Sequence, residues 1–128
     1  MAGRDFEELD VYRLAREFRR DVYVLAKTLP DEERFGLAQQ MRRASLSVTN
    51  NIAEGHGTYT FRQNISYLHR ARGSVCELRD DLNLCEDENY APSERLDEMR
   101  SMAVRLTRLI DGYIRYLRTR EGKDSAGQ

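Results

Sequence analysis

Apolar residues recur every three or four positions in four separate stretches of the chain. These stretches span residues 9–29, 35–52, 61–85 and 96–117. Such spacing places the apolar side chains on one face of an α-helix, and no strand-like alternation of useful length interrupts it. Four amphipathic helices joined by short loops predict an all-α fold, specifically an antiparallel up-down-up-down four-helix bundle.

Breakers and caps mark where the helices end. Pro30 closes the first, because proline lacks an N–H and disfavours helix in the residue before it. Gly55 and Gly57 can adopt the left-handed backbone that closes a helix, so they are predicted to end the second. Thr60 is the predicted N-cap of the third. Since residues 121–128 carry no apolar anchor, the sequence predicts a bundle over residues 1–120 and a disordered tail over 121–128.

Composition narrows the class of protein. The chain has 128 residues, of which 34% are charged, with only eight Gly and two Pro; this favours one domain of long solvated helices. No stretch approaches the roughly 18 apolar residues of a membrane span, and the N-terminus has no apolar signal core. Cys76 and Cys85 lie nine residues apart, on opposite sides of one helix, so they cannot pair. We therefore expect a cytoplasmic protein with no membrane partner.

The net charge of −1 conceals blocks of opposite sign. The blocks carry −3 over residues 1–33, +5 over 34–73, −7 over 74–98 and +4 over 99–128. Of the 21 basic residues, 19 are Arg, whose planar fork suits phosphate and carboxylate. Two interpretations stay open: the arginines bind nucleic acid, or a GC-rich genome favours Arg codons and the charged helices pair within a bundle.

Motifs of the common enzyme classes are missing. A di-iron bundle needs Glu-x-x-His on two helices, but Ala53 precedes His56 by three residues and Ser66 precedes His69. No phosphate-binding loop, nucleophile elbow or paired-carboxylate cleft is evident. The sequence therefore predicts a protein that is not an enzyme and needs no metal or cofactor.

Polar residues follow the border of the apolar face on the second and third helices. They recur at steps of three and four, and the main ones are Arg43, Ser47, Asn51, Glu54, Ser74 and Glu77. Such a stripe either exchanges hydrogen bonds and ion pairs across the seam between two helices or contacts a partner. We favour the structural interpretation and keep partner contact as the alternative.

A second set of candidates combines arginine with aromatic residues. The arginines lie in the +5 block and are Arg42, Arg62, Arg70 and Arg72, with Tyr59, Phe61 and Tyr67 among them. Guanidinium groups that contact phosphate and rings that stack on bases form the usual platform for single-stranded nucleic acid. The competing interpretation is a solvated face, with Phe61 in the core, and a pI of about 6.1 favours it.

Two sequence runs carry a family resemblance. Residues 40–55, QMRRASLSVTNNIAEG, and residues 71–78, ARGSVCEL, resemble the bacterial four-helix-bundle proteins encoded in 23S rRNA intervening sequences. Residues 6–12 and 29–37 are also similar, so the resemblance covers about residues 6–118. The polar-stripe residues from Arg43 to Glu77 fall on the motif positions of that family.

The resemblance implies a four-helix bundle that associates into a ring-shaped homopentamer and has no established catalytic residues. A related branch, the accessory proteins of diversity-generating retroelements, binds a reverse transcriptase and nucleic acid through a strongly basic surface. The net charge of −1 departs from that branch.

These features predict a homo-oligomer that acts as a binding or scaffold module for RNA or a nucleic-acid enzyme. Off the main stripes, the chain has more apolar and aromatic residues than one small bundle can bury, among them Tyr12, Tyr23, Leu46, Met102 and Tyr116. Oppositely charged blocks also suit head-to-tail contacts between copies. The alternative is a structural or protein-partner oligomer that binds no nucleic acid and uses its arginines to close its own interfaces.

Overall fold

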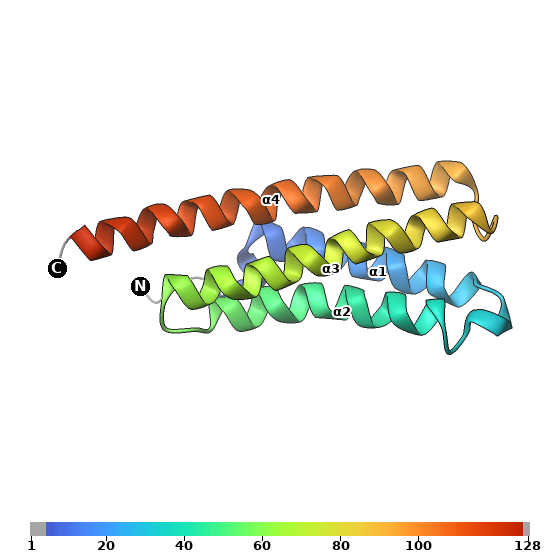
Figure 1. Ribbon diagram of the computed structural model, residues 1–128, viewed down its shortest axis with the longest axis horizontal. Helices are drawn as coiled ribbons and strands as arrows, with labels where there is room; N and C mark the ends of the chain where they lie inside the picture. Colours follow the sequence, from blue (N-terminus) through green and yellow to red (C-terminus); the bar gives the residue numbers. More distant parts are fainter. Residues whose placement is uncertain (1–4, 127–128) are drawn as a thin grey trace.

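Four long helices form an antiparallel bundle in the computed structural model, which describes residues 5–126 and their side chains as far as Gly122 (Figure 1). The helices are α1 (Asp10–Thr28), α2 (Leu37–His56), α3 (Phe61–Asp87) and α4 (Ser93–Ala126), with short 3-10 helices η1 (Phe6–Glu8) and η2 (Asp31–Glu33). Successive helices pack together, and α1 also packs on α4. No strand occurs in residues 5–126. The predicted all-α four-helix fold is confirmed.

The apolar faces of all four helices meet in one core. Phe18 of α1, Ile52 of α2, Leu82 of α3 and Leu106 of α4 are each no more than 1% exposed. Burying a side chain of this size stabilises the fold by about 1.5–3 kcal/mol, so this core determines how the helices pack. None of the helices in the described part of the chain has an apolar run suited to crossing a membrane.

The start of α2 differs from the sequence prediction. α1 ends at Thr28 just before Pro30, as predicted, but the acidic residues Asp31–Glu33 form the separate helix η2. α2 begins only at Leu37, which leaves the Phe35 ring 80% exposed rather than in the core. At the start of α3, the predicted cap is confirmed: Thr60 Oγ1 accepts a hydrogen bond from the Gln63 N–H at 3.1 Å.

The prediction that Gly55 and Gly57 close α2 in the left-handed conformation is wrong. No described glycine has a positive φ, and Gly57 has φ −83°. α2 runs through Gly55 to His56, and Gly55 is buried against α3. A Cβ there would lie 2.9 Å from Cβ of Tyr67. The missing side chain therefore permits a close approach of two helices.

The end of α4 differs from the sequence prediction. α4 remains helical through Ala126, whereas we expected a disordered tail over 121–128; residues 127–128 lie outside the described residues. Once a helix has formed, each further residue adds a hydrogen bond without needing a core contact. In Figure 1 the end of α4 projects beyond the connection between α2 and α3.

Candidate functional site

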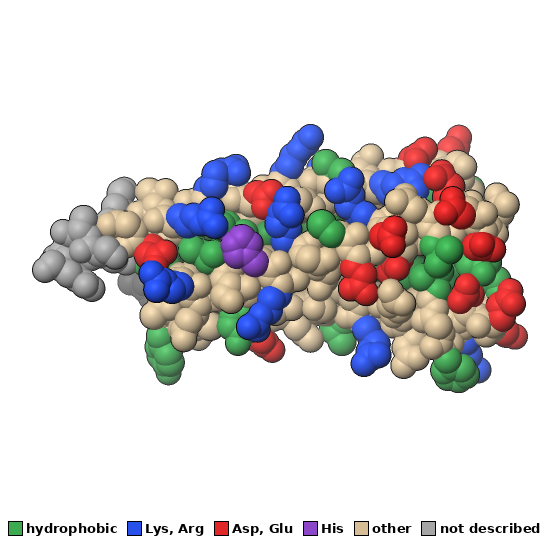
Figure 2. All heavy atoms as spheres, in the orientation of Figure 1, with side chains coloured by type: hydrophobic (Ala, Val, Ile, Leu, Met, Phe, Trp, Pro, Cys, Tyr) green, Lys and Arg blue, Asp and Glu red, His purple; other side chains and the backbone are tan. Residues whose placement is uncertain are grey.

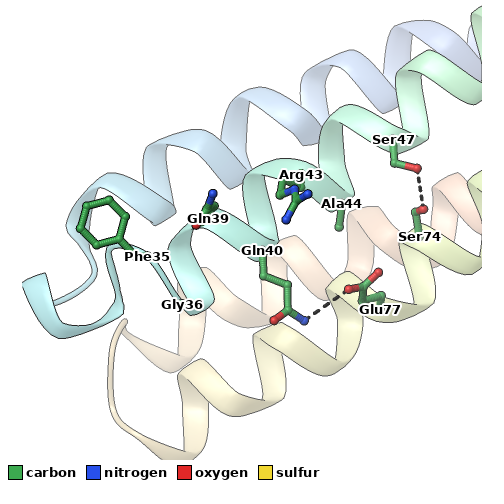
Figure 3. Close-up of a pocket in the computed structure, with 9 residues that line it drawn as sticks. All are labelled: Phe35, Gly36, Gln39, Gln40, Arg43, Ala44, Ser47, Ser74 and Glu77. Atoms are coloured by element: carbon green, nitrogen blue, oxygen red, sulfur yellow. Dashed lines mark hydrogen bonds between the residues drawn. The ribbon is translucent and has the colours of Figure 1, made fainter.

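A groove lies on the outer side of the seam between α2 and α3, and its volume is about 430 Å³. We call it the α2–α3 groove; it is lined by Phe35, Gly36, Gln39, Gln40, Arg43, Ala44, Ser47, Ser74 and Glu77 (Figure 3). Four of the six polar-stripe residues thus meet here. They come together because α2 and α3 are antiparallel and adjacent.

Small polar residues form the floor of the groove. The hydroxyl oxygens of Ser47 and Ser74 lie 3.0 Å apart in a hydrogen bond between the helices. The Asn51 Nδ2 donates to the Ser47 carbonyl at 2.8 Å and to the Ser47 Oγ at 3.0 Å. The structural interpretation of the stripe fits these three residues, because their polar atoms hydrogen-bond to one another.

The walls of the groove carry charged residues with few partners. Gln40 Nε2 donates to Glu77 Oε1 at 3.3 Å and to Asp81 Oδ1 at 3.5 Å. Arg43, three residues after Gln40 on α2, is exposed, and its guanidinium has no hydrogen bond or ion pair with a described residue. Glu54 is exposed too and lies outside the groove. Arg43 is therefore available to a partner.

Asp81 is a buried carboxylate behind Gln40. The residue is 5% exposed, and its Oδ2 atom has no hydrogen-bond partner. Burial, with smaller contributions from Glu77 and Asp80, raises the pKa of Asp81 to about 6. Asp81 follows Glu77 by four residues, so the helical spacing of the sequence already places it on the polar stripe of α3, and the structure shows that it lies nearer the core than Glu77.

The four arginines predicted to bind nucleic acid do not form one patch. Arg62 Nε lies 3.2 Å from Glu121, and Arg72 Nε lies 2.8 Å from Asp111; both contacts join α3 to α4. The Arg70 guanidinium instead lies 4.8 Å from the Tyr67 ring centroid.

Arg42 is half-buried on α2 and lies apart from the other three. Because Ser47 faces Ser74 across an antiparallel seam, Arg42 is level with residue 79. At 1.5 Å per residue it is roughly 25 Å along the bundle from Arg62.

Charge is separated along the side of the bundle formed by α3 and α4. Residues 61–73 and 107–122 carry seven arginines and two carboxylates, whereas residues 77–98 carry nine carboxylates and two arginines. Figure 2 shows acidic side chains gathered around the connection between α3 and α4, with basic ones spread toward the other end. We call residues 61–73 with 107–122 the basic half. Both of its carboxylates, Asp111 and Glu121, are already in ion pairs.

The two cysteines occupy opposite sides of α3, as predicted: Cys76 is exposed and Cys85 is buried. Burial, then the nearby charges of Asp81 and Glu33, raise the pKa of the Cys85 thiol to about 11. Within the part of the chain that the structure describes, no three His, Cys, Asp or Glu side chains are grouped to hold a metal ion.

The chain matches a known protein family. A family model for the 23S rRNA-intervening sequence protein matches residues 7–112. The chain belongs to this family. The match includes both runs that carried the resemblance, and it includes the whole α2–α3 groove. The match to the 23S rRNA-intervening sequence protein family therefore covers α1, α2 and α3 in full and α4 as far as Gly112.

A solved structure has the same fold as this member of the 23S rRNA-intervening sequence protein family. It is a protein with unknown function from the S23 ribosomal protein family of Bacteroides thetaiotaomicron, with a TM-score of 0.76 and 23% sequence identity. The similarity covers 82% of this chain and 95% of that chain, and at this identity it shows the fold alone. No curated protein matches the chain.

Proposed function

We propose that this protein is a non-enzymatic, cytoplasmic binding module that associates with RNA and works as a homo-oligomer. The observation that carries the proposal is the basic half of the α3–α4 side. Its seven arginines exceed its two carboxylates by five charges. An uncompensated positive surface of this kind attracts the phosphates of a nucleic acid and releases their counterions.

The arginines of the basic half differ in whether their guanidinium groups are paired with a carboxylate. Arg62 and Arg72 are held by Glu121 and Asp111, so they contribute little net charge. Arg70 and Arg118 are exposed and have no carboxylate partner among the described residues. Arg118 Nη2 lies 3.5 Å from Nε2 of His69, the residue before Arg70, and the Tyr67 ring lies 4.8 Å from the Arg70 guanidinium, so arginine and an aromatic ring occur together here.

Filter binding at low and moderate salt tests the proposal, with a hairpin RNA and an unstructured single strand as probes. The double variant Arg70→Gln with Arg118→Gln should weaken RNA binding about tenfold or more and reduce the salt slope by about two. The control is Arg16→Gln with Arg20→Gln, an equal charge change on exposed positions of α1, which should have a much smaller effect. No binding at low salt, or binding that salt does not weaken, would contradict the proposal.

The homo-oligomer is supported by apolar residues that the bundle leaves exposed. Leu46 is 41% and Tyr116 57% exposed, whereas Tyr12 and Met102 pack partly against the core. The family resemblance implies five subunits. Native mass spectrometry should therefore give five times the 15.0 kDa chain mass, and a monomer at micromolar concentration would contradict this part of the proposal.

A second candidate function is a structural or protein-partner oligomer that binds no RNA. The ion pairs of Arg62 and Arg72 favour it, because they occupy two predicted phosphate contacts within the subunit. Under this alternative the Arg70 and Arg118 variants leave the bound partners of the native complex unchanged, and no RNA accompanies the protein from cells.

A further inference from the structure

Glu77 and Asp81 form an acidic pair that lacks a cation. No Lys or Arg among the described residues makes an ion pair with either carboxylate, and the Oδ2 atom of Asp81 is buried with no partner. Buried carboxylates in folded proteins are almost always paired or fully hydrogen-bonded. The pair is therefore incomplete within the single chain.

Gln40 covers this pair only weakly. Its Nε2 atom is 3.3 Å from the Glu77 Oε1 and 3.5 Å from the Asp81 Oδ1, at the long limit of hydrogen bonding. Because both oxygens lie close to one nitrogen, a single planar guanidinium is able to reach both once the exposed Gln40 side chain turns away. A charged donor in this position gives shorter and stronger hydrogen bonds than a neutral amide.

The outer face of α4 carries guanidinium groups that have no partner. Arg105, Arg108 and Arg115 are exposed, and their guanidinium groups make no hydrogen bond or ion pair with a described residue. Steps of three and seven residues place them on one face of the helix. Gly112 lies between them, and a Cβ there would meet only the end of the Arg115 side chain, at 3.7 Å. Because Gly112 has no side chain, another helix is able to approach the centre of this arginine face closely.

The floor of the α2–α3 groove is also formed by residues with small side chains. Ala44, Ser47 and Ser74 line it, and a Cβ on the neighbouring Gly73 would have no atom within 4 Å. The two surfaces are thus complementary in charge and in shape: an acidic pair beside small residues, and an arginine row around a glycine.

We propose that an arginine from the outer face of α4 in a second copy of this chain enters the α2–α3 groove and pairs with Glu77 and Asp81. The second copy thereby supplies the cation that the acidic pair lacks. Since the groove and the α4 face are different surfaces of the chain, the contact is head-to-tail, which is the kind that closes into rings. This inference rests on the proposed homo-oligomer and names the residues that hold it together.

Sedimentation measurements of subunit dissociation test the acidic side of the contact. Asp81→Asn and Glu77→Gln should each raise the dissociation constant about tenfold or more, because each removes one partner of a charge pair at the interface. Asp80→Asn is the matched control: it removes the same charge from the adjacent residue, which lines a different hollow beside Asn83 and Arg100. The control should change the dissociation constant less than about twofold.

The arginine side is tested by single Gln variants of Arg105, Arg108 and Arg115. At least one should weaken assembly as much as Glu77→Gln does. Combined with Glu77→Gln, that variant should weaken assembly no further, because two residues of one contact are not additive. Circular dichroism establishes that each variant keeps its helices, and Glu77 is exposed, so its substitution leaves the fold intact.

The outcomes separate this inference from the function on which it rests. If the natural chain assembles and Asp81→Asn and Glu77→Gln assemble equally well, the inference is wrong while the homo-oligomer stands. If Asp81→Asn and Glu77→Gln weaken assembly but the effect of every arginine variant adds to that of Glu77→Gln, the α2–α3 groove does not bind an arginine of α4. The inference is then wrong. If the natural chain is monomeric at all concentrations, both are wrong.

Discussion

Gly55 of α2 and Asn64 of α3 approach so closely that a Cβ atom at residue 55 would lie 2.6 Å from the Asn64 Oδ1. Asn64 is 7% exposed, and its Nδ2 donates to the Tyr113 hydroxyl of α4 at 3.4 Å. One buried amide thus links three helices near the connection between α2 and α3. The close contact at Gly55 holds that amide in place.

Gly55→Ala should destabilise the protein by about 1–2 kcal/mol, because the cost of overpacking exceeds the gain in helix propensity. Gly73→Ala is the control: Gly73 is exposed on α3, with nothing within 4 Å of its Cβ position. That change should stabilise the protein by about 0.5–1 kcal/mol. Urea unfolding measures both, and equal effects of the same sign at the two glycines would contradict the close contact.

Asp81→Asn should stabilise the protein at neutral pH. The pKa of Asp81 is about 6 in the native state, above the ordinary value of 3.8, so the native state holds this proton more tightly than the unfolded chain does. The contribution of Asp81 to the free energy of unfolding is most favourable below about pH 4. It declines as the pH rises to about 6 and is constant above that. The substitution removes this decline and should add about 1–3 kcal/mol at pH 7.

Urea unfolding of the natural chain and Asp81→Asn at pH 5 and pH 7.5 checks this sign, at concentrations where the chain is monomeric. The difference in the free energy of unfolding should grow with pH. Asp80→Asn, an exposed position beside it, serves as the reference for loss of one negative charge. A difference that stays constant between the two pH values would show that Asp81 does not titrate in this range.

The sequence was sufficient to predict the helices and the core, because apolar periodicity reports directly on which face of a helix is buried. It was insufficient wherever the outcome depended on a neighbouring helix. Gly55 followed by His56 and Gly57 has the composition of a helix end, yet the contact with Asn64 is what requires the glycine. Phe35 continued the apolar spacing, but the chain enters α2 two residues later.

The candidate sites illustrate the same limit. Spacing placed Arg43, Ser47, Ser74 and Glu77 beside the core, and the antiparallel seam gathered them into one groove. Which arginines are neutralised depends instead on the register between α3 and α4, which sets Arg72 opposite Asp111. No single-helix pattern encodes that register, so the division between paired and free arginines emerges only from the folded chain.

The two ion pairs between α3 and α4 should differ in strength. Arg72 and Asp111 are 43% and 34% exposed and make two contacts, at 2.8 and 3.5 Å, whereas Arg62 is 87% exposed and contacts Glu121 at 3.2 Å. A double-mutant cycle with Gln or Asn should give about 0.5–1 kcal/mol for the first pair and less than about 0.3 kcal/mol for the second. Raising the salt concentration should reduce the first value, and a larger coupling for Arg62 would contradict the difference in exposure.

The thiols should react in two clearly separated steps. Cys76 is exposed, whereas Cys85 is 0% exposed and its pKa is raised to about 11 by burial first and the Asp81 charge second. Because the thiolate is the reactive form, a colourimetric disulfide reagent at pH 8 should modify one thiol in the native protein and the second only after unfolding. Cys76→Ser should abolish the fast reaction, and Cys85→Ala should leave it unchanged. Two fast thiols in the folded natural chain would mean that α3 opens near Cys85, and that Asp81, one turn earlier, is not held in a buried site.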